Sequence, residues 1–301
     1  MTANIQQIQT AAEGWSIEVT PAGATKIDNF AACLLPGTTV NVTFLPGSDP
    51  MDTVAVAKRL HNEGMNAVPH LAARSLKDSD QIDSLLASYR AEAGVDEVLI
   101  IGGGVHQPVG TFDNSLQILE TGLLQKHGIR RVGVAGHPEG SPDISQSQIA
   151  EALGAKNALA KREGLKMYIE TQFCFEAPIV LEWEKTVRAA GNELPIRIGI
   201  PGPATIKTLF RFAQISGIGP SMRFISKQAR NVAKLMTVQS PHVLLSDLAK
   251  GMANDSDCLI ENFHFYPFGG FAKTAIYANA VASGSIQLLP KGGFDVIDTA
   301  A

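Results

Sequence analysis

One glutamate, Glu18, has the setting of a general acid. In the segment SIEVTP (16–21), alternation places Ser16 and Glu18 on one face of a short strand and apolar side chains on the other. If the apolar face packs against helices, the carboxyl points inward, where burial raises its pKa. A carboxyl that keeps its proton near neutral pH suits proton donation. A salt-bridged glutamate at the rim of the fold is the alternative.

Polar or flexible residues also stand at the ends of other β-rich runs. Four such positions are Thr43, His70, His137 and Gln172. Another run ends in Gly102, Gly103 and Gly104, and His106 and Gln107 follow. Three consecutive glycines let the backbone approach a flat or bulky group and leave its amides free to bind an anion. A tight turn is the plainer explanation of the same glycines.

Several familiar catalytic motifs are missing from the sequence. Histidines near the run ends (His70, His106, His137 and His264) raise the possibility of a metal site, but there is no HxH pair and no aspartate on a late strand. The glycine segment lacks the third glycine of GxGxxG, and neither GxxxxGK[ST] nor GxSxG occurs. A metal centre, a Rossmann domain, nucleotide-triphosphate chemistry and a serine nucleophile are therefore disfavoured.

Eight β-rich runs must position these residues. They cover 15–20, 39–44, 66–71, 97–102, 131–136, 166–173, 196–201 and 258–266. Helix patterns lie between them, for example over 49–63, 80–92 and 115–127, and most strand starts are separated by one β/α unit. This rhythm predicts an α/β fold, a parallel eight-stranded (β/α)8 TIM barrel that forms a single domain over 1–301. Extra helices are expected between strands seven and eight, over 204–216, 221–237 and 241–253.

In such a barrel the chemistry lies at the carboxyl ends of the strands, where the βα loops converge. Those ends are where the glutamate, the histidines, the glutamine and the glycines described above are found. We therefore expect them to form one site.

The composition is that of a globular protein. The chain has 301 residues, 45% hydrophobic and 18% charged, with a formal net charge of −4. No basic run favours nucleic acid or an anionic membrane surface. The first residues lack the pattern of a signal peptide, and no apolar stretch is long enough to cross a membrane, so we expect a cytoplasmic protein. Three distant cysteines predict buried or semi-buried thiols rather than disulfides or a zinc site.

The strand ends, taken in order, resemble the methylenetetrahydrofolate reductase family. The matching segments are SIEVTP at 16–21, NVTF at 41–44, VPHLAAR at 68–74, VAGHPEGSPD at 134–143, ETQFCFE at 170–176, IGIPGP at 198–203 and FHFYPFGGFAKT at 263–274. Seven segments in the family's order span nearly the whole chain. The resemblance implies a barrel that binds FAD and transfers a hydride between NAD(P)H and the one-carbon unit of tetrahydrofolate.

Residue roles carry over from that resemblance. Glu18 matches the glutamate that protonates the folate nitrogen, and Gln172 matches the glutamine that hydrogen-bonds the pterin. The positions implied to contact the cofactor are Thr43, His70, Gly102, Gly103, Gly104, Phe112, Ala135, His137 and Lys161. The family ends its fourth strand with Arg-Gly-Asp, whereas this chain has glycines there, so His106 or Gln107 is expected to contact the substrate instead.

One site stabilises the same transition state in both directions, so the resemblance is compatible with reduction of methylenetetrahydrofolate and with oxidation of methyltetrahydrofolate, with NADH or NADPH. Two other functions remain open. One is a folate enzyme that works without flavin, by direct hydride or methyl transfer. The other is a non-catalytic folate-binding subunit. The resemblance also implies a role in one-carbon metabolism and methionine biosynthesis, and a homo-oligomer (dimer or tetramer) is expected.

Overall fold

The computed structural model describes residues 2–215 and 235–297. Eight parallel strands form a closed barrel in the order β1-β10-β7-β6-β5-β4-β3-β2. These strands are β1 (Ser16–Val19), β2 (Thr39–Val42), β3 (Asn66–Ala72), β4 (Glu97–Ile101), β5 (Arg131–Gly136), β6 (Lys166–Phe173), β7 (Ile196–Pro201) and β10 (Ile260–Tyr266). Each lies within two residues of its predicted bounds, and the predicted barrel class is confirmed.

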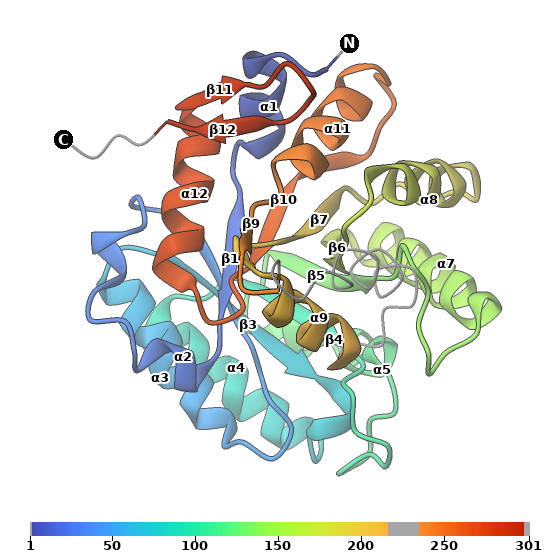
Figure 1. The fold of residues 1–301 in the computed structure, drawn as a ribbon. Coiled ribbons are helices and arrows are strands. Elements are labelled where there is room, and N and C mark those ends of the chain that lie inside the picture. Colours follow the sequence, from blue (N-terminus) through green and yellow to red (C-terminus); the bar gives the residue numbers. More distant parts are fainter. Residues whose placement is uncertain (1, 216–234, 298–301) are drawn as a thin grey trace. The chain divides into compact units, whose positions relative to one another are not determined.

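Helices connect the strands and surround them (Figure 1). They are α1 (Ile5–Ala12), α2 (Pro21–Ala24), η1 (Phe30–Ala32), α3 (Pro50–Asn62), η2 (Ala73–Ser75), α4 (Ser79–Ala93), α5 (Ser115–Leu119), α6 (Leu123–Lys126), α7 (Gln146–Glu163), α8 (Ala177–Ala189), α9 (Ile206–Ile215), α11 (His242–Ala253) and α12 (Phe271–Ser283). In the part of the chain that the structure describes, no helix combines the length and apolar character needed to span a membrane.

The chain divides into two compact units, each built from separated stretches of sequence. Unit 1 comprises residues 1–15, 136–151 and 171–301, and unit 2 comprises 16–135 and 152–170. Both units contribute strands to the barrel. The expectation that 1–301 acts as a single domain stays a prediction.

In unit 2, β1 to β4 pair in parallel, and the register aligns Glu18 with Asn41 and His70 with Leu99. Most side chains of these strands are buried, because helices cover the outer face of the sheet. On the outside, α3 packs against α4, and the buried Thr53 and Tyr89 hydroxyls of these helices hydrogen-bond at 2.5 Å. Strands and helices of unit 2 therefore hold the β1 to β4 ends in fixed register.

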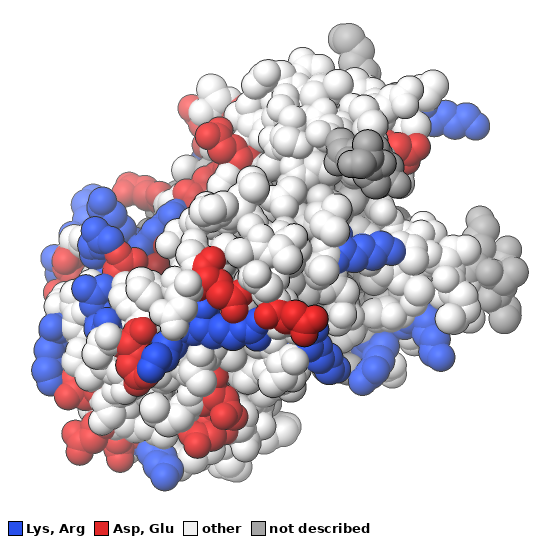
Figure 2. All heavy atoms as spheres, turned by 90° about the vertical axis from the view of Figure 1, so that its left-hand side faces the viewer, with Lys and Arg blue, Asp and Glu red and all other residues white. Residues whose placement is uncertain are grey.

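The surface of unit 2 is charged with both signs. Figure 2 shows acidic and basic side chains interspersed over the lower part of the view, where α2, α3 and α4 lie. Ion pairs between Lys58 and Glu92 (3.1 Å) and between Lys126 and Asp83 (2.7 Å) contribute to this mixture. The pattern agrees with the small net charge of the sequence.

In unit 1, β7 and β10 pair in parallel, with Phe263 and Phe265 fully buried. Trp15 packs edge-on against Phe265 at 5.8 Å between ring centroids. Helix α1 contacts α11 and α12, and a C-terminal hairpin of β11 (Ile286–Leu288) and β12 (Phe294–Val296) packs on the same helices. Neither α1 nor the hairpin was among the predicted elements.

Between strands seven and eight, two of the three predicted extra helices are observed, as α9 and α11. The helix predicted over 221–237 falls almost wholly outside the described residues. A two-stranded ribbon of β8 (Ala204–Thr205) and β9 (Val238–Gln239) was not predicted. The helix predicted over 115–127 is wrong in its continuity, because Gly122 adopts a left-handed φ of 74° and separates α5 from α6.

Candidate active site

Glu18 of β1 is hydrogen-bonded to the end of the neighbouring strand β2. The Thr43 hydroxyl of the β2 end donates a hydrogen bond of 3.2 Å to Glu18 Oε2. Burial raises the pKa of Glu18 to about 7, and the hydrogen bond from Thr43 offsets only part of that rise. The structure therefore brings together two residues that the sequence placed at separate strand ends, and it leaves the carboxyl able to carry a proton near neutral pH.

A second carboxyl is buried within the same unit. Asn41 Nδ2 donates a hydrogen bond of 2.6 Å to Glu170 Oε1, and the two residues are 0% and 4% exposed. Asn41 Oδ1 has no hydrogen-bond partner among the described residues. Sequence reasoning did not select this pair, although alternation along β2 puts Asn41 on the same face as Thr43.

His70 is buried without a hydrogen bond. It is 6% exposed, and neither ring nitrogen has a partner among the residues that the structure describes. Burial lowers the pKa of His70 to about 4, so the imidazole is neutral at physiological pH and offers one donor and one acceptor. A buried side chain with both polar atoms unpaired is rare, and a bound ligand would supply the missing partners.

The three glycines form a bare stretch of backbone after β4. A Cβ atom built on Gly102 or Gly104 would meet nothing within 4 Å. Gly103 needs its glycine, because it has a φ of +90° and its Cβ would lie 3.3 Å from Ala72 Cβ. The open space at these glycines and the unpaired ring of His70 fit the flat ring system of a flavin.

The remaining predicted residues of unit 2 differ in their exposure. His106 and Gln107 are exposed in the loop after the glycines, and Ala135 is partly buried near the end of β5. Phe112 is 5% exposed, so most of its ring packs inside the protein. On α7, Lys161 is exposed, whereas Lys156 is 8% exposed and burial lowers its pKa to about 8.

Unit 1 holds the other predicted residues, Gln172 and His137, both partly buried. Gln172 Oε1 accepts a hydrogen bond of 3.2 Å from the Phe173 N–H. In residues 2–215 and 235–297 no group of three or more His, Cys, Asp or Glu side chains is arranged to hold a metal ion.

An aromatic cluster in unit 1 escaped sequence reasoning. Phe212 of α9 stacks on Phe268 at 4.5 Å between ring centroids, and Phe173 meets Phe268 edge-on at 4.9 Å. Tyr266 packs against Phe173 at 5.3 Å and donates a hydrogen bond of 3.0 Å to the Thr171 carbonyl. Phe268 has a φ of 47°, a strained value for a residue with a side chain. Such strain is concentrated at functional sites. The loop belongs to the segment 263–274 that carries the family resemblance, but the contacts between its rings and Phe173 and Phe212 join residues distant in the sequence, so only the structure shows them.

Comparisons with known proteins agree with this architecture. The family model described as methylenetetrahydrofolate reductase matches residues 24–268, a range that begins after Glu18. Methylenetetrahydrofolate reductase 2 of Saccharomyces cerevisiae is 27% identical over 184 residues, which are 58% of this chain and 30% of the yeast protein. The chain thus matches less than a third of that relative's length.

Among solved structures, a protein from Clostridium thermocellum that binds two copies of 5-methyl-5,6,7,8-tetrahydrofolic acid has the same fold. The TM-score is 0.53 at 13% identity, and the match covers 91% of this chain and 99% of that one. The predicted family is confirmed by the extent of the family match. This chain belongs to the methylenetetrahydrofolate reductase family.

Proposed function

We propose that the protein transfers a hydride between NAD(P)H and the one-carbon unit of tetrahydrofolate with the help of bound FAD. Family membership supports the substrate class. The observation that carries the proposal is Glu18, a carboxyl whose pKa is raised to about 7 and which Thr43 holds by a hydrogen bond. A protonated carboxyl of this kind is what opening of a folate methylene bridge requires.

In the proposed reaction Glu18 donates its proton to the folate nitrogen as the methylene bridge opens to an iminium ion. In the opposite direction the same carboxylate takes the proton back, since one site serves both directions. Gln172 presents an amide with donor and acceptor to the edge of the pterin. His106 and Gln107, exposed after the glycines, contribute further contacts with the folate.

The residues that would hold FAD are the nine positions implied by the family resemblance: Thr43, His70, Gly102, Gly103, Gly104, Phe112, Ala135, His137 and Lys161. When bound, FAD accepts a hydride from one substrate and passes it to the other. His70 would hydrogen-bond the ring edge, and the bare glycine backbone would lie beside the ring face. The same proposal assigns the protein to the cytoplasm, as a homo-oligomer, in one-carbon metabolism that supplies methionine biosynthesis.

The Glu18→Gln variant separates the two half-reactions. It is expected to bind FAD and to oxidise NAD(P)H like the wild type, because the proton donor acts only on the folate. Its turnover with methylenetetrahydrofolate should fall by about 100-fold or more. Glu13→Gln, which alters an exposed carboxyl at the end of α1, is the matched control. Full folate turnover by Glu18→Gln would contradict the assigned role.

One observation favours a second candidate, a folate enzyme that works without flavin. Of the two lysines of α7 that could meet the FAD phosphates, Lys156 is buried and Lys161 is exposed, so at most one of the two is accessible as an anchor. A colourless preparation with full activity and no FAD detectable by mass spectrometry would favour this candidate over the first.

A further inference from the structure

The side chain of Arg74 contacts the backbone of the loop after β4, which lies more than 30 residues further along the chain. It lies in η2, directly after the strand that carries His70. Its Nε donates to the Val105 carbonyl at 2.9 Å and its Nη2 to the His106 carbonyl at 2.6 Å. Its Nη1 reaches the Asp113 carbonyl and carboxylate, both at 3.4 Å. One guanidinium therefore joins three points of residues 102–113, called the glycine loop below.

The backbone on either side of Arg74 supports the same loop. Arg74 N–H donates to the Gly102 carbonyl, and Val109 N–H donates to the Arg74 carbonyl, each at 2.9 Å. Thr111 N–H donates to the Lys77 carbonyl at 2.9 Å. Next to it, a Cβ on Gly110 would lie 1.8 Å from the Lys77 oxygen, so only glycine allows this approach. The η2 segment and the glycine loop thus form one hydrogen-bonded unit.

The contacts of Arg74 differ from those of an ordinary surface ion pair. Its side chain is 28% exposed, and its closest bonds go to neutral carbonyls rather than to the 66% exposed Asp113. A planar guanidinium with five donors can serve several carbonyls in fixed directions, which the point charge of lysine cannot do. Arg74 therefore fixes the shape of the loop and adds little by charge pairing.

We propose that Arg74 is the positioning residue that sets the bare glycine backbone and the His106–Gln107 pair at the spacing a flat ring ligand requires. This inference rests on the proposed function, because it takes the glycine loop as a ligand-binding segment. At this strand end the loop is supported by η2 through the side chain and the backbone of Arg74. Arg74 itself touches carbonyls of the loop and acts through them.

The test uses Arg74→Met, which keeps the length of the side chain and removes its donors. Without ligand, amide hydrogen exchange of residues 102–113 should accelerate while exchange of β1 to β3 stays as in the wild type. The Kd for FAD and the KM for methylenetetrahydrofolate should rise about 10–100-fold, because a small misplacement of a binding loop is costly, with a smaller change in kcat. Arg74→Lys should recover little of this loss.

Arg90→Met is the matched control, since Arg90 Nη1 also donates to two carbonyls, those of Gly94 and Val95, at the end of α4. It should lower thermal stability and leave Kd and KM unchanged. Gly110→Ala provides a second disturbance of the glycine loop, should Arg74→Met not fold, and it should raise the same two constants.

The wild type tests the proposed function, and the Arg74→Met variant tests the inference about Arg74. If the wild type binds neither FAD nor folate, the proposed function is wrong, and with it the ligand role of the loop. If the wild type binds both and Arg74→Met binds them equally well, with unchanged exchange of 102–113, the inference about Arg74 is overturned alone. Full recovery by Arg74→Lys would also overturn it, since charge and not the fork of donors would then suffice.

Discussion

At the scale of single residues, burial has opposite consequences for two groups of unit 2. It raises the pKa of Glu18 to about 7 and lowers the pKa of His70 to about 4. In both cases the uncharged form is favoured, because a charge loses its hydration when water is excluded. At neutral pH unit 2 therefore holds a carboxyl near its titration point and an imidazole that remains neutral.

The first prediction concerns Glu18 and pH. Between pH 4.5, the ordinary value, and about 7, the folded protein holds a proton on Glu18 that the unfolded chain has released, so stability falls as the pH rises through this window. Gln has no such proton. The free energy of unfolding of Glu18→Gln should therefore equal that of the wild type near pH 4 and exceed it above pH 7 by on the order of 1–3 kcal/mol. Urea unfolding across this range measures the difference, and a constant difference would contradict the raised pKa.

The second prediction concerns His70, where the sign is reversed. The unfolded chain takes up a proton below pH 6.5, whereas the folded protein does so only near pH 4, so stability falls as the pH drops through this window. Between pH 6.5 and pH 4, the free energy of unfolding of His70→Leu should fall by on the order of 2–3 kcal/mol less than that of the wild type. His61→Gln, at an exposed histidine of α3, should leave the loss in place. Equal acid unfolding of His70→Leu and the wild type would show that His70 is not buried as described.

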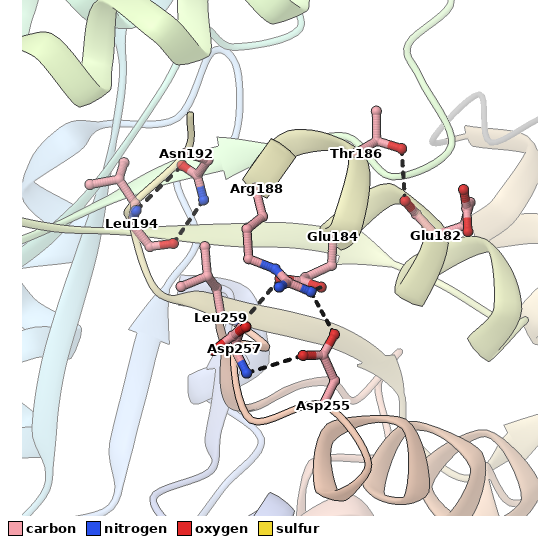
Figure 3. A network of polar contacts seen from close by, with 9 residues as sticks. All are labelled: Glu182, Glu184, Thr186, Arg188, Asn192, Leu194, Asp255, Asp257 and Leu259. Atoms are coloured by element: carbon pink, nitrogen blue, oxygen red, sulfur yellow. Dashed lines mark hydrogen bonds and ion pairs between the residues drawn. The ribbon is translucent and has the colours of Figure 1, made fainter. Parts of the chain in front are cut away.

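At the scale of elements, a polar network ties α8 to the segment before β10 (Figure 3). Glu184, 0% exposed, accepts hydrogen bonds from Arg188 Nε at 2.8 Å and from the Leu259 N–H at 3.1 Å. Arg188 Nη2 also binds Asp255 Oδ2 at 2.6 Å. The Asp257 N–H, and then Arg188, lower the pKa of Asp255. This network lies at the amino end of β10 and contains none of the predicted site residues, so we assign it to stability rather than to chemistry.

The third prediction follows from that network. Glu184→Ala leaves the partly buried Leu259 N–H and the Arg188 guanidinium without the acceptor that the fully buried Glu184 supplies, which should lower the free energy of unfolding by about 1–3 kcal/mol. Ligand affinities should not change. Glu92→Ala, which removes an exposed ion pair with Lys58, is the comparison and should cost less than about 1 kcal/mol. Urea unfolding of both variants distinguishes them, and equal losses would mean that the network contributes no more than a surface pair.

Elements differed in how far the sequence predicted them. Strands were located closely because alternation and turn residues are local signals. The helix over 115–127 was extended through Gly122, since its apolar spacing continues across a residue that in fact turns the chain. Helix α1 was missed, although Asn4 and Gln7 form a capping box that marks its start. In a helix of eight residues the apolar pattern is too short to stand out.

At the scale of the whole molecule, the sequence predicted the closed barrel and the family, and the strand order and the family match confirmed these two predictions. It did not predict contacts between residues distant in the sequence. Arg74 was not selected because its closest partners are backbone carbonyls, which no side-chain motif records. The Asn41–Glu170 pair likewise joins residues of β2 and β6, and only the closed strand order brings them within hydrogen-bonding distance.

The proposed function requires hydride exchange between a folate and FAD on this barrel. The most direct test is the visible spectrum of the FAD-loaded protein, titrated without oxygen with methyltetrahydrofolate. We expect the flavin absorbance to bleach with methyltetrahydrofolate and with NAD(P)H in the wild type, and only with NAD(P)H in Glu18→Gln. A wild-type protein that takes up no FAD, or whose flavin band is unchanged by methyltetrahydrofolate while NAD(P)H bleaches it, would contradict the claim.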